Sequence, residues 1–356
     1  MEKLNRTRAI LEELKLDAIL VTSPYNMRYI SGFAGGEGLL YITREKSILF
    51  TDSRYTIQAK AESKTFTVVE SASQSKTVEK LTVLFKEDKI EAVGLEDEVL
   101  TYKEAKSYMD ISDKIHWVGL ESRLEALRII KTEDELQKLE KAEGIGDAAF
   151  SHILTVIKPG ITELEIAAEL EYFMKKNGAL KTSFDTIIAS GINSSMPHAI
   201  PTTKKVELGD FVTMDFGCMV DGYCSDMTRT IVVGKADKKQ KEIYNIVLKA
   251  QLESLAAVKA GVKGSEIDAI ARKIIGDAGY GDCFGHGLGH SVGLFIHEDP
   301  RFSPTCDEII RANTIMTVEP GIYVDGFGGV RIEDMIVVTE DGYRNFAHSE
   351  KNLIEL

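Results

Sequence analysis

The segment FVTMDFGCMVDGYCSDMTRTIVV, residues 211–233, restricts the fold of this chain more than any other part of it. Two apolar, β-branched runs flank an Asp-Gly dipeptide at 221–222, which is typical of a two-residue hairpin turn. Such a turn places Asp226 opposite Gly217 and makes Asp215 the diagonal neighbour of Asp226 on the same face. Diagonal neighbours lie roughly 7–8 Å apart, so both carboxylates can reach one metal ion. The alternative, a solvated polar face, does not explain two aspartates among Phe, Met and Val.

Two glutamates further along the chain lie in similar local patterns. Glu319 ends an apolar run and meets a Pro-Gly pair, which stops a strand where a side chain must project. Glu333 lies in the alternating run GGVRIEDMIVV, where it shares one face with Arg331 and Met335. A buried carboxylate needs a partner, so an ion pair with Arg331 is a purely structural explanation of Glu333. The pattern alone leaves both explanations open.

The fifth candidate ligand is His290, in the segment HGLGHSVGLFIHEDPR at 286–301, which holds three of the seven histidines. A single histidine is usually a satisfied core or surface group, but three in one glycine-punctuated apolar segment indicate a site. One imidazole with four carboxylates favours Mn²⁺, Co²⁺, Fe²⁺ or Zn²⁺ over a thiolate site and does not choose among them. Two such cations can activate water at neutral pH and polarise a carbonyl.

Composition excludes several classes of protein. The chain has 356 residues, enough for about two domains, and its net charge of −13 argues against a nucleic-acid partner. The four cysteines show no CxxC pair and no disulfide-like spacing, which is typical of small core residues in a reducing compartment. The N-terminus lacks a signal-peptide pattern, and no apolar run approaches the ~20 residues that cross a bilayer. We therefore expect a cytoplasmic protein without a membrane partner.

The first part of the chain, to about residue 120, alternates strand-like and helix-like segments, which predicts an α/β domain. The expected strands are at 17–22, 38–43, 47–51, 65–70 and 91–96. The glycine-rich stretch at 32–38 lacks the spacings of nucleotide-binding loops, so a nucleotide role is not expected. We expect two domains, 1–125 and 126–356.

The second part of the chain repeats one order of elements. Capping boxes at 132–135 and 162–165 predict the starts of two helices, and the aspartate hairpin follows them. A long helix over roughly 238–259 and a shorter one from Ser265 then precede the strands that carry the glutamates.

The acidic residues recur at nearly the same interval. Glu319 follows Asp215 by 104 positions (319 − 215), and Glu333 follows Asp226 by 107 (333 − 226). We interpret this as a duplication in which each half contributes two carboxylates. A pseudo-twofold arrangement of the halves would put the metal ions at its centre.

The motifs MPHAIP, TMDFG, YCSDMTRT, HGLGHSVGLFIHE, TVEPG and VRIED resemble those of the pita-bread metallopeptidases. That family includes methionine aminopeptidase, aminopeptidase P and Xaa-Pro dipeptidase (prolidase), with creatinase as a metal-free relative. The resemblance extends over the whole chain and implies an α+β fold. A creatinase-like α/β domain would precede a pita-bread pseudo-twofold domain. Methionine aminopeptidases lack the first domain, which favours the prolidase and aminopeptidase P branch.

The resemblance also implies a set of metal ligands. Asp226 and Glu333 would bridge two divalent ions, Asp215 would complete one site, and His290 with Glu319 would complete the other. Manganese is the expected metal, with cobalt, zinc and iron as alternatives. All five positions match the family pattern, which argues against an inactive relative.

Three further residues match the lining of the family's cleft. His198 and His297 would donate hydrogen bonds to the substrate, and Glu319 would act as the general acid or base. Arg301 lies where some prolidases bind the free carboxylate of a C-terminal proline. Its alternative role is a surface arginine paired with an acidic residue at 298–299.

The expected activity is hydrolysis of the X-Pro bond in dipeptides. Aminopeptidase P, which acts on longer X-Pro peptides, remains an alternative. A non-catalytic pita-bread binding module and a creatinase-like hydrolase are further alternatives, although both typically lack the metal ligands. The resemblance implies a homodimer, and the partner expected in the cleft is a short X-Pro peptide.

Overall fold

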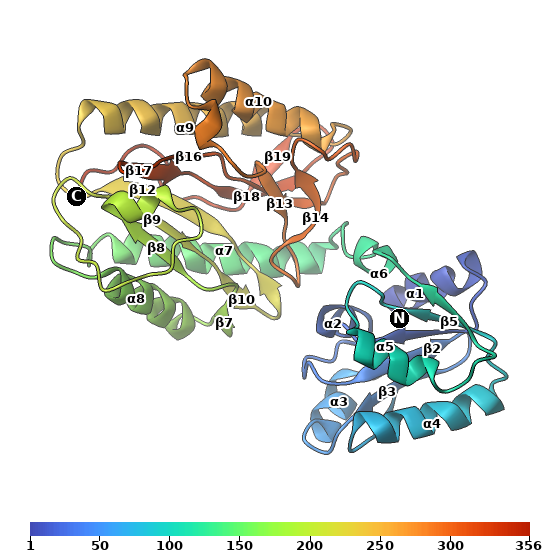
Figure 1. Ribbon diagram of the computed structural model, residues 1–356. Helices are drawn as coiled ribbons and strands as arrows, with labels where there is room; N and C mark the ends of the chain where they lie inside the picture. Colours follow the sequence, from blue (N-terminus) through green and yellow to red (C-terminus); the bar gives the residue numbers. More distant parts are fainter. The chain divides into compact units, whose positions relative to one another are not determined.

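The computed structural model describes residues 1–356, which divide into two compact units, Met1–Arg128 and Ile129–Leu356 (Figure 1). Both units combine helices with sheets, which confirms the α+β class. The domain bounds expected from the sequence, 1–125 and 126–356, remain a prediction. None of the helices is long and apolar enough to cross a bilayer.

The first unit is built on one six-stranded sheet in the order β4-β3-β2-β1-β5-β6. Its strands are β1 Ala18–Val21, β2 Leu39–Thr43, β3 Ser47–Thr51, β4 Thr67–Glu70, β5 Ala92–Leu95 and β6 His116–Gly119. The five strands expected from the sequence are all present. The edge strand β6 was not anticipated, because a four-residue run with exposed ends carries little pattern.

Six helices accompany this sheet: α1 Glu2–Glu13, α2 Pro24–Ser31, α3 Thr56–Glu62, α4 Gln74–Glu87, α5 Tyr102–Met109 and α6 Arg123–Ala126. The start of α2 illustrates the local cause. Ser23 accepts a hydrogen bond from the backbone of Asn26, and Pro24 at the first helical position has no N–H to leave unpaired.

The second unit contains two helix pairs, which flank its strands on opposite sides (Figure 1). They are α7 Glu133–Ile153 with α8 Glu163–Lys176, and α9 Lys238–Ala257 with α10 Gly264–Asp277. Both capping boxes expected at 132–135 and 162–165 are formed. Each pair therefore begins where the sequence predicts, to within one residue.

The strands between the helix pairs form short antiparallel sheets, chiefly β12-β9-β8, β15-β18-β19, β16-β17 and β13-β14. The strands are β7 Lys181–Thr182, β8 Ile187–Ser190, β9 Phe211–Phe216, β10 Cys218–Val220, β11 Tyr223–Cys224, β12 Met227–Val232, β13 Gly289–Ser291, β14 Glu298–Phe302, β15 Ile315–Val318, β16 Gly321–Val324, β17 Gly328–Arg331, β18 Asp334–Val338 and β19 Tyr343–Asn345. Two 3₁₀ turns, η1 Gly191–Ser195 and η2 Gly281–Cys283, complete the unit.

Each helix pair covers its own apolar core. Residues from α7, α8, β8 and β9 form one cluster, which includes Phe150, Leu170 and Met214. Residues from α9, α10 and β15 form the other, which includes Tyr244 and Met316. Full burial of such a side chain contributes about 1.5–3 kcal/mol, so each half has its own source of stability. This division agrees with the interpretation of a duplicated unit.

Candidate metal centre

The aspartate hairpin has the register expected from the sequence. Val220 pairs with Tyr223 across a two-residue turn whose residues, 221–222, have φ of 48° and 84°. Positive φ at both positions is the requirement of a type I′ turn. The pairing continues to Thr228 opposite Asp215, which leaves Asp215 diagonal to Asp226, the residue just before β12.

Gly217 allows the two strands of the hairpin to approach closely just before Asp226. A Cβ atom at position 217 would lie 1.9 Å from the carbonyl oxygen of Ser225, so only glycine fits. Asp226 stands between β11 and β12 and is buried, and its backbone N–H donates a hydrogen bond to Glu143 Oε2 at 3.3 Å.

Three candidate ligands from three separate segments meet in the second unit. One side-chain ligand atom each of Asp226, His290 and Glu333 lie within 4.8 Å of one another, and all three residues are buried. The imidazole Nε2 of His290 is 3.5 Å from Asp226 Oδ2 and 3.4 Å from Glu319 Oε1. Asp215 lines the same cleft. The structure thus brings together all five residues expected from the sequence.

The ring of His290 is oriented for ligation. Its Nδ1 lies 3.1 Å from the carbonyl oxygen of Ser291, so an Nδ1–H tautomer leaves the Nε2 lone pair directed at the carboxylates. Burial lowers the pKa of His290 to about 3, which keeps the imidazole neutral, the state that binds a metal.

The carboxylates lie close together in the wall of one cleft, where their like charges repel one another. Burial, followed by the charges of neighbouring acidic groups, raises the pKa of Asp226 and of Glu333 well above the ordinary range. Burial also raises the pKa of Glu319 to about 8, although Arg331 opposes that shift. These carboxyl groups cannot all ionise at once, because their negative charges repel one another. A bound divalent cation would offset that repulsion.

One oxygen in the site has no protein partner. Asp215 Oδ1 is buried without a hydrogen bond, while Asp215 Oδ2 accepts one from Arg331 Nη2 at 2.5 Å. Together with the crowded carboxylates and the neutral imidazole, this orphaned oxygen fits the donor set of a hard divalent metal.

The sequence suggested Arg331 as a partner of Glu333, and the structure assigns both residues differently. The guanidinium of Arg331 bonds to Asp215, to Tyr323 and to the hydroxyl of Thr228. Glu333 accepts instead from the hydroxyl of Thr228 at 2.6 Å. The strand alternation around Glu333 is also interrupted, because β17 ends at Arg331 and β18 begins three residues later, at Asp334.

Two residues beside the centre had no role in the sequence interpretation. Tyr323 Oη accepts from Arg331 Nη1 at 2.9 Å and lies 2.9 Å from Nε2 of His286. His286 was visible as part of the histidine-rich segment. Tyr323 carried no sequence signal, because it lies outside every motif that was assigned to the site.

The remaining candidates line the same cleft, whose volume is about 770 Å³. His198, His297 and Arg301 all contribute to its wall. The rings of His297 and His290 lie 4.7 Å apart, edge to face. Burial, followed by the charge of Arg301, lowers the pKa of His297. Arg301 Nε lies 3.3 Å from Asp299 Oδ1, and its side chain is 47% exposed, so it pairs locally while still facing the cleft.

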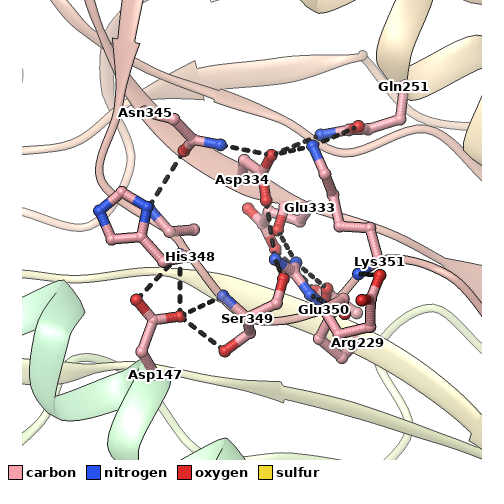
Figure 2. A network of polar contacts seen from close by, with 12 residues as sticks. Asp147, Arg229, Gln251, Glu333, Asp334, Asn345, His348, Ser349, Glu350 and Lys351 are labelled. Atoms are coloured by element: carbon pink, nitrogen blue, oxygen red, sulfur yellow. Dashed lines mark hydrogen bonds and ion pairs between the residues drawn. The ribbon is translucent and has the colours of Figure 1, made fainter. Parts of the chain in front are cut away.

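A buried polar network lies directly behind Glu333 (Figure 2). At its centre is Arg229, which is 1% exposed and donates five hydrogen bonds. Its acceptors are the carbonyl oxygens of Thr228, Glu333, Ser349 and Glu350 and the carboxylate of Asp334. One nitrogen, Nη1, bonds to both Thr228 and Glu333, so it ties the strand after Asp226 to the Glu333 backbone.

Asp334 completes the network with its second oxygen, which accepts from Gln251, Asn345 and Lys351 (Figure 2). Burial acts to raise the pKa of Asp334, but the charges of Arg229 and Lys351 outweigh burial and lower it. The carboxylate is therefore ionised and fully paired, in contrast to the crowded carboxylates on the cleft side.

Two known protein families match this chain, one in each of its two compact units. Residues 137–340 match the model of metallopeptidase family M24, and residues 3–130 match the creatinase/prolidase N-terminal domain.

Three relatives illustrate the similarity. A solved Xaa-Pro dipeptidase from Bacillus anthracis is 43% identical with a TM-score of 0.96, covering 100% of this chain and 99% of that one. A Xaa-Pro dipeptidase from Pyrococcus furiosus is 39% identical over 99% of each chain. A solved X-Pro aminopeptidase from Thermotoga maritima is 37% identical with a TM-score of 0.90, covering 97% of this chain and 99% of that one.

Proposed function

Because this chain belongs to metallopeptidase family M24, in the branch with a creatinase/prolidase N-terminal domain, we propose that it hydrolyses the peptide bond before proline in X-Pro dipeptides. The observation that carries the proposal is the convergence of four carboxylates and a neutral histidine at one cleft. Relatives of the same length named Xaa-Pro dipeptidase support the choice of substrate.

Family membership implies divalent metal ions, and we propose that there are two of them, with manganese as the expected metal. Asp215, Asp226, His290, Glu319 and Glu333 would together hold them, since all five line one cleft. When bound, the ions would lower the pKa of water to give a nucleophile at neutral pH and polarise the scissile carbonyl.

Glu319 is the proposed general acid and base. Its side chain is only 15% exposed, and the hydroxyl of Thr317 donates to its Oε1 at 3.1 Å. A group in this position can accept the proton of the attacking water and deliver it to the leaving imide nitrogen. A pKa raised toward neutrality suits both steps.

His198 and His297 are the proposed hydrogen-bond donors to the substrate carbonyl as it becomes tetrahedral. A donor placed in this way lowers the barrier by about 3–4 kcal/mol. The imide nitrogen of an X-Pro bond has no hydrogen, so recognition must depend on the ring shape and on carbonyl geometry.

Arg301 is proposed to bind the free carboxylate of a C-terminal proline. Its guanidinium lines the cleft and has only one exposed, local carboxylate partner, Asp299, which a substrate carboxylate can displace. Binding at this position would favour dipeptides, because a third residue would separate the terminal carboxylate from Arg301.

The second candidate function is that of an aminopeptidase P, and the similarity to the Thermotoga maritima X-Pro aminopeptidase favours it. The two functions share their chemistry and differ in substrate length. The test is a series of X-Pro dipeptides and X-Pro-X tripeptides, each assayed with added Mn²⁺ and with chelator. Faster cleavage of the dipeptide supports a dipeptidase, and equal turnover of both lengths contradicts it.

We also propose that the protein is a cytoplasmic homodimer. The resemblance to prolidases supports the dimer, and four free cysteines, two of them buried, suit a reducing compartment. A non-catalytic binding module is the remaining alternative. Metal analysis separates it, because a protein without bound metal and without chelator-sensitive hydrolysis would be such a module.

A further inference from the structure

Glu163 is a fully buried carboxylate whose partners are hydrogen-bond donors rather than a cation. Its relative exposure is 0%, and it is the first residue of α8. Oε1 accepts from the N–H of Ser190 at 2.7 Å, from the Ser190 hydroxyl at 2.9 Å and from Asn193 at 3.0 Å. Oε2 accepts from the N–H of Thr202 at 3.0 Å and from the Thr202 hydroxyl at 2.6 Å.

These donors come from the two ends of one segment, residues 190–202. One oxygen of Glu163 holds Ser190, where β8 ends, and the other holds Thr202. The first backbone N–H groups of α8 reinforce the closure, since Leu164 donates to the carbonyl of Thr202 at 3.1 Å. Glu163 therefore closes the base of this segment in the manner of a clamp.

The segment so closed carries His198 into the cleft. It has little support of its own: η1 is a single short 3₁₀ turn, and Ile192 and Ile200 are 60% and 82% exposed. Its other anchors come from β17, where Gly329 donates to Ser194 and Arg331 donates to Pro197. The position of His198 thus depends on Glu163 on one side and on β17 on the other.

The chemistry of Glu163 suits this role. Every group around its oxygens is a donor, and an ionised carboxylate accepts at both oxygens without presenting a hydrogen of its own. Glutamine at this position would direct its amide hydrogens against donors. The N-terminus of α8 stabilises the negative charge, which helps to offset the cost of burying it.

We propose that Glu163 is a positioning residue, which holds His198 at the cleft by clamping the ends of segment 190–202. Its role in catalysis rests on the proposed function of His198 as a donor to the substrate, whereas the clamp itself is independent of that function. Loss of the clamp leaves the metal ligands in place and releases only the segment that carries His198.

A double-mutant cycle tests the catalytic part. Glu163→Gln should lower kcat/KM for an X-Pro dipeptide about tenfold in the wild-type background and less than about twofold in a His198→Ala background, because coupled residues are not additive. Equal fold losses in both backgrounds would overturn the proposal. Should Glu163→Gln fail to fold, Thr202→Val removes one donor to the clamp at an exposed position and should show the same background dependence.

Glu165→Gln is the matched control. Glu165 caps the same helix end through Thr162 and its side chain makes no hydrogen bond to segment 190–202. Glu165→Gln should lower Tm, because the loss of a helix cap destabilises the folded state by about 1 kcal/mol. It should leave kcat/KM within about twofold of wild type, because Glu165 does not hold the segment that carries His198.

Amide hydrogen exchange tests the clamp apart from activity. Exchange in residues 191–201 should be at least about tenfold faster in Glu163→Gln than in Glu165→Gln, because local opening controls exchange. Unchanged exchange overturns the clamp, whether or not the protein hydrolyses X-Pro peptides. Faster exchange in Glu163→Gln, together with no peptidase activity in the wild-type protein, would leave the clamp standing and remove the proposed function.

Discussion

Arg331 and Asp215 form a buried ion pair, 2.5 Å from Nη2 to Oδ2, in which the second oxygen of Asp215 has no partner. One oxygen is thus held by the protein and the other is left for a ligand. Arg331 therefore fixes the orientation of the Asp215 carboxylate and leaves Oδ1 available to a metal ion.

Replacing Arg331 by methionine should therefore destabilise the protein by about 3–5 kcal/mol, because it leaves a buried carboxylate uncompensated. Metal affinity should also fall. Chemical denaturation measures the first effect, and titration with Mn²⁺ measures the second. Arg331→Lys should retain part of both, since the charge remains but the fork of donors is lost. Metal affinity equal to wild type in Arg331→Met would contradict a role in orienting Asp215.

Removal of the metal ions should abolish hydrolysis and lower Tm. At a free metal concentration of 100 times Kd, one bound ion stabilises the folded state by about 2.7 kcal/mol. Dialysis against chelator followed by thermal scans should show the loss, and added Mn²⁺ should reverse it. Full activity in a preparation that metal analysis finds empty would refute the metal centre.

The metal-free protein should lose stability as pH rises. Burial raises the pKa of Glu319 from its ordinary value of 4.5 to about 8, with Arg331 opposing the shift. A carboxyl with a raised folded-state pKa contributes stability that is fully present below about pH 4.5 and is lost as the pH rises through about 8. Thermal scans of chelated protein over this range should show a falling Tm. Metal-loaded protein and Glu319→Gln should both show a flatter profile, and identical slopes in all three would contradict the prediction.

Arg301→Ala should reduce the preference for dipeptides over tripeptides. Loss of a charge-assisted hydrogen bond of about 1.5–3 kcal/mol corresponds to a decrease of roughly 10- to 100-fold in kcat/KM for the dipeptide. The tripeptide should be affected much less, and Arg301→Lys should be intermediate. A parallel loss on both substrates would show that Arg301 does not bind the terminal carboxylate.

Arg229→Met should destabilise the second unit by about 3–5 kcal/mol, because Asp334 would lose its buried partner. Arg344→Met is the control, since the Arg344–Glu140 pair has 43% of each side chain exposed and such pairs contribute about 0–1 kcal/mol. Urea unfolding compares the two variants. Similar midpoints would show that the network behind Glu333 is not a stabilising feature.

The local parts of the fold and of the site were predictable because they follow from short-range patterns. The Asp-Gly turn determines the pairing of Thr228 with Asp215, and the capping boxes determine where α7 and α8 begin. These features depend on neighbours in the chain, where residue type and spacing determine geometry.

The partners of Arg331 and the network around Arg229 were not predictable in this way. An ion pair between Arg331 and Glu333, two residues away, was one of two explanations that the sequence left open, and Arg331 pairs instead with Asp215, 116 positions earlier. Arg229 finds acceptors more than 100 positions away, in residues 333–334 and 349–350. Local alternation says which face a side chain occupies, but only the packing of both halves decides which group it meets there.

The proposed metal centre takes Asp215 and Asp226 from one half of the second unit and His290, Glu319 and Glu333 from the other. Neither half holds a complete coordination set. If the halves descend from one duplicated unit, a single-unit ancestor could have assembled such a centre only by pairing with a second copy of itself. Gene fusion would then have turned a concentration-dependent assembly into a property of one molecule, and would have freed each half to lose the ligands that the other supplies.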